Sequence, residues 1–425
     1  MRLPAEADDS GIVLSHPTGN ANSRGVLGGL LASDQLAAFH TTIATFDRGI
    51  WAQLGKTRLG RDFGRRRFDE AAKARTHQRP SRELARMVAG RLGLGFLTRH
   101  ETSLCSVDAV YRDLDRHVAR RIGRSQFRAV YSYEDGALET FRTAKSLGIK
   151  CLYDLPIGYW KSARKLLETE RERWPEWEST MPGFRDSDEK LACKDEELQL
   201  ADRIYVASRF TKQTLSEFDG PLAPVEVIPY GFPDPGPQRS FEDIHHRPLK
   251  LLFVGGLSQR KGIADVFAIA DQLGDAVDLT VVGRSAVQSC NVLNDALGRH
   301  RWIPSLPHDD VLRLMRENDV LLFPSLFEGF GLVITEAMSQ GTPVITTDRT
   351  AGPDVITSGE DGWIIPAGNT PALRSAVENI LDDPDQIVRI SENARQTAMR
   401  RPWETYGKTL ATAIKTYLET EVDGQ

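Results

Sequence analysis

The stretch FPSLFEGFGLVITEAMSQGTPVI, residues 323–345, is the most informative part of the sequence for the fold of the second half of the chain. It predicts a strand, a loop with two glycines, a helix and a second strand. Glycines let the backbone approach a ligand closely, and the free amides at a helix start attract anions. We therefore expect the amides of Phe330, Gly331 and Leu332 to bind a phosphate.

Two glutamates flank this loop, Glu328 within it and Glu336 in the predicted helix. Carboxylates accept hydrogen bonds from paired hydroxyl groups but are poor partners for phosphate. A ligand that carries phosphate between two polyols, such as a nucleotide sugar, fits this arrangement. An isolated pair of glutamates would be an ordinary turn residue and a solvated helix residue, but the adjoining loop favours the ligand.

A second glycine-containing loop, VGGLSQRKG at residues 254–262, lies between a predicted strand and a predicted helix. Gly255 and Gly256 free the backbone, while Arg260 and Lys261 place positive charge just before the helix. This charge suits a leaving diphosphate, which becomes more negative as its bond breaks. The loop matches neither GxGxxG nor a Walker A sequence, so taken alone it equally fits a basic surface loop.

Around this stretch, strand and helix patterns alternate from residue 250 to residue 347, which predicts a Rossmann-like domain. The first half alternates in the same way, with strand patterns at 11–14, 127–133, 150–155 and 202–207. With 425 residues, the chain suits two α/β domains of about 200 residues each, facing each other across a cleft.

The Pro/Gly-rich stretch VEVIPYGFPDPGPQ marks a boundary near residue 235. We predict domains at 1–235 and 236–402, and a helix at about 403–420 that either caps the second domain or crosses back to the first. In the first domain, the loop HPTGNANSRG follows the first strand, at the sheet edge where open sheets bind ligands. This loop places Gly19 and Asn20 on the acceptor side.

The composition is that of an ordinary folded protein, with 40% hydrophobic and 27% charged residues. No stretch reaches the roughly 18 apolar residues of a spanning helix, and the start of the chain lacks the apolar core of a secretory signal. We therefore expect a cytoplasmic protein. Its four cysteines are far apart, which indicates reduced thiols rather than a disulfide framework.

The segment from Lys56 to Arg91 is strongly basic, with twelve basic and four acidic residues in a chain of net charge -5. Such a cluster fits contact with an anionic membrane, for example at the inner face of the plasma membrane, and equally fits a solvated face or an anionic acceptor. Nucleic-acid binding is not expected, because no recognition motif accompanies the segment. An apolar stripe would support membrane contact if the segment is helical: Leu59, Phe63, Phe68, Leu84, Met87 and Leu92.

No metal or cofactor is expected. Two DxD sequences, at 113–115 and 186–188, lie in helical or loop patterns away from any strand end, and we interpret them as solvated charge. The nine histidines show no HxH or HExxH spacing.

Together these motifs resemble the family-four retaining glycosyltransferases, which have the GT-B fold, a G-x-L-x-x-x-K-G loop and an E-x7-E segment in this order. The resemblance covers roughly residues 250–370. It implies that Lys261 contacts the donor diphosphate, Glu328 lies by the donor sugar and Glu336 holds the ribose hydroxyls. It also implies that the segment from Trp302 to Pro304 borders the base.

The sequence departs from the family pattern at three positions. Gly256 stands where an arginine is common, so that Arg260 supplies the second positive charge. Asp354 replaces a commoner glutamate. In CLYDLPIGYW, Asp154 lies near the place of a first-domain histidine and is assigned to the acceptor side.

The resemblance implies transfer of a hexose-type sugar from a nucleoside diphosphate sugar to a hydroxyl acceptor, with retention and without a metal. The acceptor would belong to cell-surface polysaccharide or glycolipid assembly and would be lipid-linked. A sugar-nucleotide epimerase of the same fold and a non-catalytic sugar-nucleotide-binding protein remain alternatives. A Rossmann oxidoreductase is disfavoured because HPTGNANSRG does not match GxGxxG.

Overall fold

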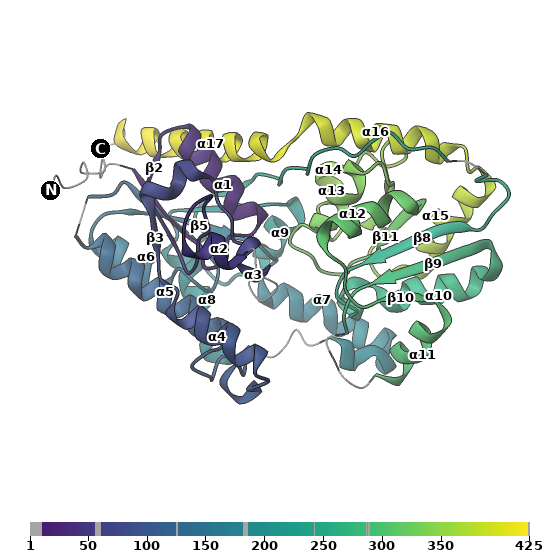
Figure 1. The fold of residues 1–425 in the computed structure, drawn as a ribbon, viewed down its shortest axis with the longest axis horizontal. Coiled ribbons are helices and arrows are strands. Elements are labelled where there is room, and N and C mark those ends of the chain that lie inside the picture. The colour runs from purple at the N-terminus through teal and green to yellow at the C-terminus, as the bar shows by residue number, and fades with distance from the viewer. Residues whose placement is uncertain are drawn as a thin grey trace.

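The computed structural model describes residues 11–55, 61–124, 126–181, 186–241, 243–285, 287 and 290–423. Figure 1 shows two α/β lobes side by side, each built around a sheet with helices on both sides. The predicted fold class, two Rossmann-like domains in the GT-B arrangement, is confirmed.

The first lobe contains a seven-stranded sheet in the order β3-β2-β1-β4-β5-β6-β7, and all its neighbouring strands are parallel. The central strands are fully buried apolar runs, as expected for a parallel sheet covered on both faces. The strands are β1 Ile12–Ser15, β2 Leu36–Thr41, β3 Thr76–Gln78, β4 Ala129–Tyr133, β5 Lys150–Leu155, β6 Arg203–Val206 and β7 Val225–Val227.

The helices of the first lobe join these strands in sequence order. Four of them matter for the sites below: α1 follows β1, α4 and α5 lie between β3 and β4, and α6 follows β4. Their bounds are α1 Ala21–Ala32, α4 Ser81–Arg91, α5 Val107–Ile122 and α6 Leu138–Ser146. Three further helices lie between β5 and β7: α7 Trp160–Arg173, α8 Asp188–Leu200 and α9 Arg209–Thr214.

The second lobe contains a six-stranded parallel sheet in the order β10-β9-β8-β11-β12-β13. Its strands are β8 Leu249–Val254, β9 Val277–Val282, β10 Arg301–Ile303, β11 Val320–Phe323, β12 Val344–Thr347 and β13 Trp363–Ile365. Its helices are α10 Ile263–Leu273, α11 Asn291–Arg299, α12 His308–Glu317, α13 Leu332–Ser339, α14 Gly352–Val355, α15 Thr370–Asp382 and α16 Gln386–Arg400.

The C-terminal helix α17, Trp403–Asp423, lies over the first lobe, whereas α16 lies over the second (Figure 1). The side chains of Trp403 and Tyr406 pack against Gly25 of α1, and the backbone of Gly407 meets Gly29. The chain therefore crosses between the lobes twice. The two crossings run side by side, since the amide of Phe232 donates to the carbonyl of Arg401 at 2.9 Å.

The sequence does not reveal the role of the segment 162–200. In the structure, side chains of this segment contact the second lobe. Arg173 at the end of α7 forms an ion pair with Asp265 of α10, at 2.6 Å. Trp177 stacks on Phe267 of α10, with ring centroids 6.0 Å apart. Among the described helices, none is both long and apolar enough to cross a membrane.

Candidate functional site

The first part of the site is the loop between β8 and α10. Gly255 has φ +159°, and Gly262 has φ +71° at the start of α10. A Cβ atom at Gly262 would collide with the carbonyl of Pro324, which follows β11. Glycine is therefore required where this loop meets the FPSLFEGFG segment, and the two predicted ligand loops are adjacent.

Arg260, Lys261 and Glu328 form one charged cluster where these loops meet. Lys261 forms an ion pair with Glu328, and each of the two side chains is 14% exposed. Arg260 Nη1 donates to the carbonyl of Phe327 at 2.6 Å and lies 3.4 Å from Glu328 Oε2. The structure thus brings together the three residues that the sequence singled out for catalysis.

Burial sets the protonation chemistry of this cluster. Burial, and to a smaller extent the neighbouring Arg260 guanidinium, together lower the pKa of Lys261 to about 6. Burial also lowers the pKa of Arg260. An anion that enters the cluster would favour the charged form of the lysine. The cluster is therefore suited to a ligand that brings negative charge.

The second part of the site is the start of α13. Gly331 precedes this helix with φ +89° and provides no side-chain cap. The amides at the helix start, which include those of Phe330 and Leu332, are the groups that a capping side chain or a ligand satisfies. Phe330 is itself 3% exposed, so its ring packs in the core while its backbone belongs to the loop.

Glu336 lies one turn into α13, with its side chain 22% exposed. Burial raises the pKa of its carboxyl, and His308 at the start of α12 opposes this shift from 3.9 Å. Trp302, in the segment predicted to border the base, is 42% exposed and donates from its ring to the carbonyl of Gly283 at 2.9 Å.

The loop that holds Glu328 is also fixed by the first lobe. Gly329 approaches the backbone of Pro156 and Ile157, which follow β5, so closely that a Cβ atom would collide with it. The hydroxyls of Ser208 and Thr211 donate to the carbonyl of Gly329 at 2.6 and 3.0 Å. Sequence reasoning missed these contacts, because nothing in the local pattern links β5 or α9 to this loop.

Asp354, where the family pattern has a commoner glutamate, forms a second link between the lobes. Its side chain is 4% exposed and accepts from Arg209 Nε at 2.8 Å. It also accepts from the amide of Arg209 at 3.0 Å. Asp354 therefore caps α9 of the first lobe from α14 of the second.

On the acceptor side, Gly19 and Asn20 lie in the loop after β1, as the sequence predicts. Gly19 has φ +64°, and the ring of Phe68 fills the space that a Cβ atom would need. Asn20 Oδ1 accepts from the amide of Ser23 at 3.0 Å and caps α1. Both residues thus have structural roles in the loop. Contact of Gly19 and Asn20 with an acceptor stays a prediction.

His16, which directly follows β1, forms hydrogen bonds with the backbone of this loop. Its Nδ1 accepts from the amides of Thr18 and Gly19, at 3.2 and 3.0 Å, and burial lowers its pKa to about 3. A neutral histidine that accepts two backbone hydrogen bonds fixes the shape of the loop.

Asp154 lies at the end of β5 and is 3% exposed. Tyr131 donates to its carboxylate at 2.7 Å, and burial raises the pKa of Asp154 to about 7. Tyr230 and Tyr406, the latter on α17, line the same small space. The described partners of Asp154 are thus protein groups, and its assignment to the acceptor stays a prediction.

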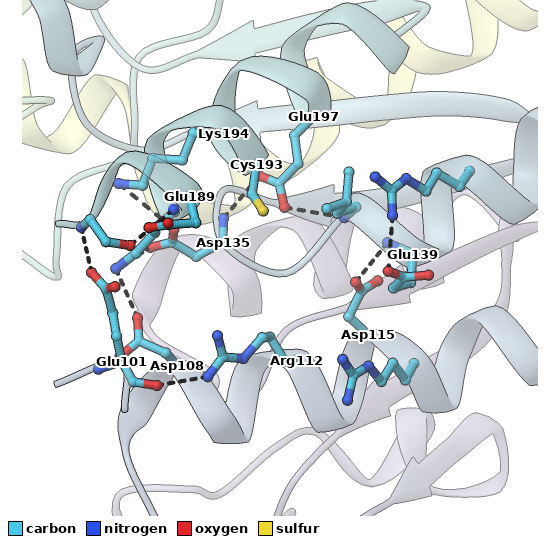
Figure 2. Close-up of a pocket in the computed structure, with 15 residues that line it drawn as sticks. Glu101, Asp108, Arg112, Asp115, Asp135, Glu139, Glu189, Cys193, Lys194 and Glu197 are labelled. Carbon is cyan, nitrogen blue, oxygen red and sulfur yellow. Dashed lines mark hydrogen bonds and ion pairs between the residues drawn. The ribbon is translucent and has the colours of Figure 1, made fainter. Parts of the chain in front are cut away.

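The interpretation of the first DxD sequence, at 113–115, as solvated charge is wrong. Asp113 pairs with Arg79 at 2.7 Å, and the carboxylate of Asp115 accepts from the amides of Glu139 and Thr140 at the start of α6. Asp115 lines a cavity of about 290 Å³ between α5, α6 and α8. Glu197 lines the same cavity and caps the same helix (Figure 2). These carboxylates hold the helix start, because a helix N-terminus attracts negative charge.

Asp186, of the second DxD sequence, lies near this cavity with Glu101 and His100, and the three offer ligand atoms within 4.8 Å of one another. Lys190 and Lys194 each lie 3.2 Å from Asp186 and already neutralise its charge. This cluster does not point to a metal, and the expected independence from metal stays a prediction.

The match to a known family lies in the second lobe. Residues 237–397 match the model of a family described as glycosyl transferases group 1. Glycogen synthase of Mycobacterium tuberculosis is 29% identical over 206 residues, which are 46% of this chain and 49% of that protein. Phosphatidyl-myo-inositol mannosyltransferase of Mycobacterium leprae is 28% identical over 172 residues, 39% of this chain and 46% of that protein. The chain thus spans about half the length of the curated relatives it matches.

Solved structures share the fold of the whole chain. Sucrose-phosphate synthase from Thermosynechococcus elongatus has a TM-score of 0.66 at 17% identity and covers 97% of this chain and 100% of its own. HepE of Anabaena, in complex with UDP and glucose, has a TM-score of 0.61 at 14% identity and covers 96% and 100%. The chain therefore carries a glycosyl transferases group 1 domain on the GT-B fold, and the resemblance to family-four glycosyltransferases is confirmed.

Proposed function

We propose that this protein transfers a hexose-type sugar from a nucleoside diphosphate sugar to a hydroxyl acceptor, with retention of anomeric configuration. The observation that carries the proposal is the cluster of Arg260, Lys261 and Glu328 beside the uncapped start of α13. It offers two cations and backbone amides for a diphosphate, with one carboxylate beside them. HepE, which shares the fold, was solved with UDP and glucose.

The reaction uses the departing diphosphate as the base. The bond between the anomeric carbon and the diphosphate oxygen breaks, and the acceptor oxygen forms its bond on the same face of the sugar. The acceptor proton goes to the departing diphosphate, whose charge Lys261, Arg260 and the loop amides stabilise. Glu328 positions the sugar, and Glu336 accepts hydrogen bonds from the ribose hydroxyls.

The test is a thermal-shift screen against nucleotide sugars that differ in base and sugar, followed by product analysis with the donor that stabilises the protein most. We expect one donor class to raise the melting temperature and to release nucleoside diphosphate together with a glycosylated acceptor. An altered sugar still attached to the nucleotide would instead identify an epimerase. Donor binding without turnover across an acceptor panel would identify a sugar-nucleotide-binding protein.

We also propose that the first lobe contacts an anionic membrane, where a lipid-linked acceptor in polysaccharide or glycolipid assembly would be found. Five exposed apolar side chains support this contact, and we call them the apolar tip: Val88 (53% exposed), Leu92 (67%), Phe96 (60%), Leu104 (70%) and Val107 (54%). They belong to α4, the start of α5 and the turns between them, at the lower end of the first lobe in Figure 1. Arg91 and Arg99 are exposed in the same segment.

This surface differs from the one expected from the sequence. Phe63 and Phe68 of the predicted apolar stripe are buried, at 7% and 5% exposure, and Lys56 and Leu59 lie outside the described residues. Several arginines of the basic segment form ion pairs within the lobe, among them Arg66 with Glu83 and Arg79 with Asp113. The apolar tip, rather than the whole segment from Lys56 to Arg91, is therefore the surface that we assign to the membrane.

A further inference from the structure

One segment of the first lobe, residues 160–180, reaches the second lobe, and we call it the arm (Figure 1). It consists of α7 and the 3₁₀ helix Pro175–Thr180. Its far end is part of the core of the second lobe, because Trp177 is buried in the same apolar cluster as side chains of β8 and α10. The arm thus belongs to the first lobe by its place in the chain and to the second by its packing.

The end of the arm contacts the loop that carries the two cations of the donor site, residues 255–261, which we call the cation loop. This loop ends in the 3₁₀ helix Gln259–Lys261. The Oγ1 atom of Thr180, a fully buried residue, accepts from the amide of Gln259 at 3.0 Å. The same hydroxyl donates to the carbonyl of Trp177 at 2.7 Å, within the arm. One hydroxyl group therefore joins the arm to the cation loop.

The side chain of Gln259 is fully buried, and each of its polar groups has a partner. Its Nε2 donates to Glu170 Oε2 of the arm and to Asp265 Oδ2 of α10, both at 3.1 Å. Its Oε1 accepts from the amide of Ala264 at 2.9 Å. A buried side chain with all its partners in place favours one conformation, because the alternatives leave buried polar groups unpaired. Gln259 is therefore fixed between the arm and α10.

Arg260 and Lys261 directly follow this fixed residue. The amide of Arg260 donates to Ser258 Oγ at 3.3 Å, and the amide of Lys261 donates to the carbonyl of Ser258 at 2.8 Å. The two cations thus share one turn of backbone with Gln259, and a displacement of Gln259 would move them both. Charged groups that are ordered before a ligand arrives bind it more tightly, because less conformational entropy is lost on binding.

We propose that Thr180 and Gln259 are positioning residues, which fix the cation loop so that Arg260 and Lys261 meet the diphosphate of the donor. The inference rests on the proposed transferase function and adds an arm of the first lobe to the donor site of the second. Since both residues are fully buried, they act through the backbone of the loop and not by contact with the donor. Loss of the Thr180 hydroxyl should therefore weaken binding of the diphosphate part of a nucleotide and leave binding of the nucleoside part unchanged.

Thr180→Val is the informative variant, because valine has nearly the shape of threonine but lacks the hydroxyl. It leaves the buried amide of Gln259 without its partner. Thr180→Ser keeps a hydroxyl and should bind like the wild type. Thr140→Val is the matched control, at an equally buried threonine of α6 whose hydroxyl donates to the carbonyl of Asp115 at 3.2 Å. Melting temperatures verify that each variant is folded.

The test compares a nucleoside diphosphate with its nucleoside. UDP, ADP, GDP and CDP are titrated into the wild type by calorimetry, and the diphosphate that binds most tightly is used for the variants. The affinity of the matching nucleoside is measured by competition against this diphosphate. We expect Thr180→Val to weaken the diphosphate about tenfold, as for one lost hydrogen bond, and to leave the nucleoside affinity unchanged. Thr140→Val should change neither affinity.

A double-mutant cycle with Lys261→Ala tests whether the effect passes through the cation. In the Lys261→Ala background, Thr180→Val should weaken diphosphate binding by less than threefold, because the lysine that the arm positions is gone. An equal effect of Thr180→Val in both backgrounds would overturn the inference. So would an equal loss of diphosphate and nucleoside affinity, since the arm would then support the whole domain and not the cation loop.

The wild type separates this inference from the proposed function. If the wild type binds a nucleoside diphosphate and folded Thr180→Val binds it equally well, the positioning role is overturned and the transferase proposal stays intact. Failure of the wild type to bind any of the four diphosphates contradicts the transferase proposal itself, and the inference that rests on it is overturned as well.

Discussion

The ammonium group of Lys261 forms an ion pair with the carboxylate of Glu328, although the two residues belong to different loops of the second lobe. This pair joins the loop after β8 to the loop after β11. A diphosphate that binds beside Lys261 would share the lysine with Glu328, so the carboxylate becomes available to a sugar hydroxyl when the donor arrives. The two residues are therefore expected to act together but to fail in different ways when substituted.

Lys261→Ala should lower turnover about 10²-fold or more, because it removes positive charge where the leaving diphosphate becomes more negative. The measurement is the release of nucleoside diphosphate under saturating donor, with circular dichroism to verify the fold. Lys408→Ala, at an exposed lysine of α17, serves as the control and should keep wild-type turnover. A folded Lys261 variant with near-normal turnover would remove this residue from the mechanism.

The two glutamates should differ in the step that they affect. Glu336→Ala should weaken the binding of free nucleoside diphosphate about tenfold, because the ribose hydroxyls lose their acceptor. Glu328→Ala should leave that affinity nearly unchanged and lower the rate with the sugar donor. Calorimetry and steady-state kinetics on both variants separate these effects. Unchanged nucleotide affinity in the Glu336 variant would contradict the ribose assignment.

The role of Glu336 also predicts a pH dependence. Burial raises the pKa of this carboxyl above its ordinary value, so its protonated form persists to a higher pH than for an exposed glutamate. The ionised carboxylate can accept a hydrogen bond on each of its two oxygens, as the proposed contact with two ribose hydroxyls requires, whereas protonation turns one of them into a donor. Nucleotide affinity should therefore fall as the pH is lowered through this raised pKa. Glu336→Gln removes the titrating group, so the nucleotide affinity of this variant should not show this fall. The nucleotide affinities of the wild type and the variant are compared at the same pH values.

The sequence predicted that Arg260, Lys261 and Glu328 belong to adjoining loops, and the structure brings these three residues together, because they come from short, local motifs. Arg260 and Lys261 are neighbours, and Glu328 and Glu336 are joined by one loop and one helical turn, so their spacing alone constrains their positions. The contacts of Gly329 with Pro156 and of Arg209 with Asp354 join residues more than 100 positions apart. No local sequence pattern predicts a contact between residues so far apart.

The sequence predicted the first lobe less well for a related reason. From the sequence alone, charged residues such as Asp115 and Arg66 are expected at the surface. In the structure they are 4% and 8% exposed. Each is buried because the tertiary fold supplies a partner, namely the start of α6 for Asp115 and Glu83 for Arg66. Burial of a charge depends on that partner, which the count of basic and acidic residues does not reveal.

The crossing of α1 and α17 gives a prediction on stability. Gly29→Ala should destabilise the protein by about 2 kcal/mol, because the new Cβ would collide with the backbone of Gly407 and push α17 away from the first lobe. Gly28→Ala, one position earlier in the same helix, meets nothing within 4 Å and should be neutral or stabilising. Urea denaturation of both variants measures the difference, and equal midpoints would show that α17 does not pack tightly at this crossing.

The last prediction concerns the apolar tip on α4 and the turns that follow it. Leu92 and Phe96 are 67% and 60% exposed, and their transfer into a bilayer interface would remove apolar surface from water. Arg99 is exposed in the same segment and would add attraction to anionic lipid of roughly 1 kcal/mol before screening by salt. In vesicle flotation, we expect binding that requires phosphatidylglycerol and declines with salt. The variant with both Leu92→Ser and Phe96→Ser should lose it, and Arg99→Glu should weaken it.

Leu147→Ser is the control for this experiment, because Leu147 is 48% exposed at the end of α6, outside the tip. A general loss of surface hydrophobicity would affect the control and the tip variant alike, whereas insertion of the tip would affect only the latter. Arg66 is left unchanged here, since its buried pair with Glu83 would break and the lobe itself would be destabilised. Equal flotation of the wild type with neutral and anionic vesicles at low salt, or equal flotation of the wild type and the tip variant, would show that the tip serves another purpose.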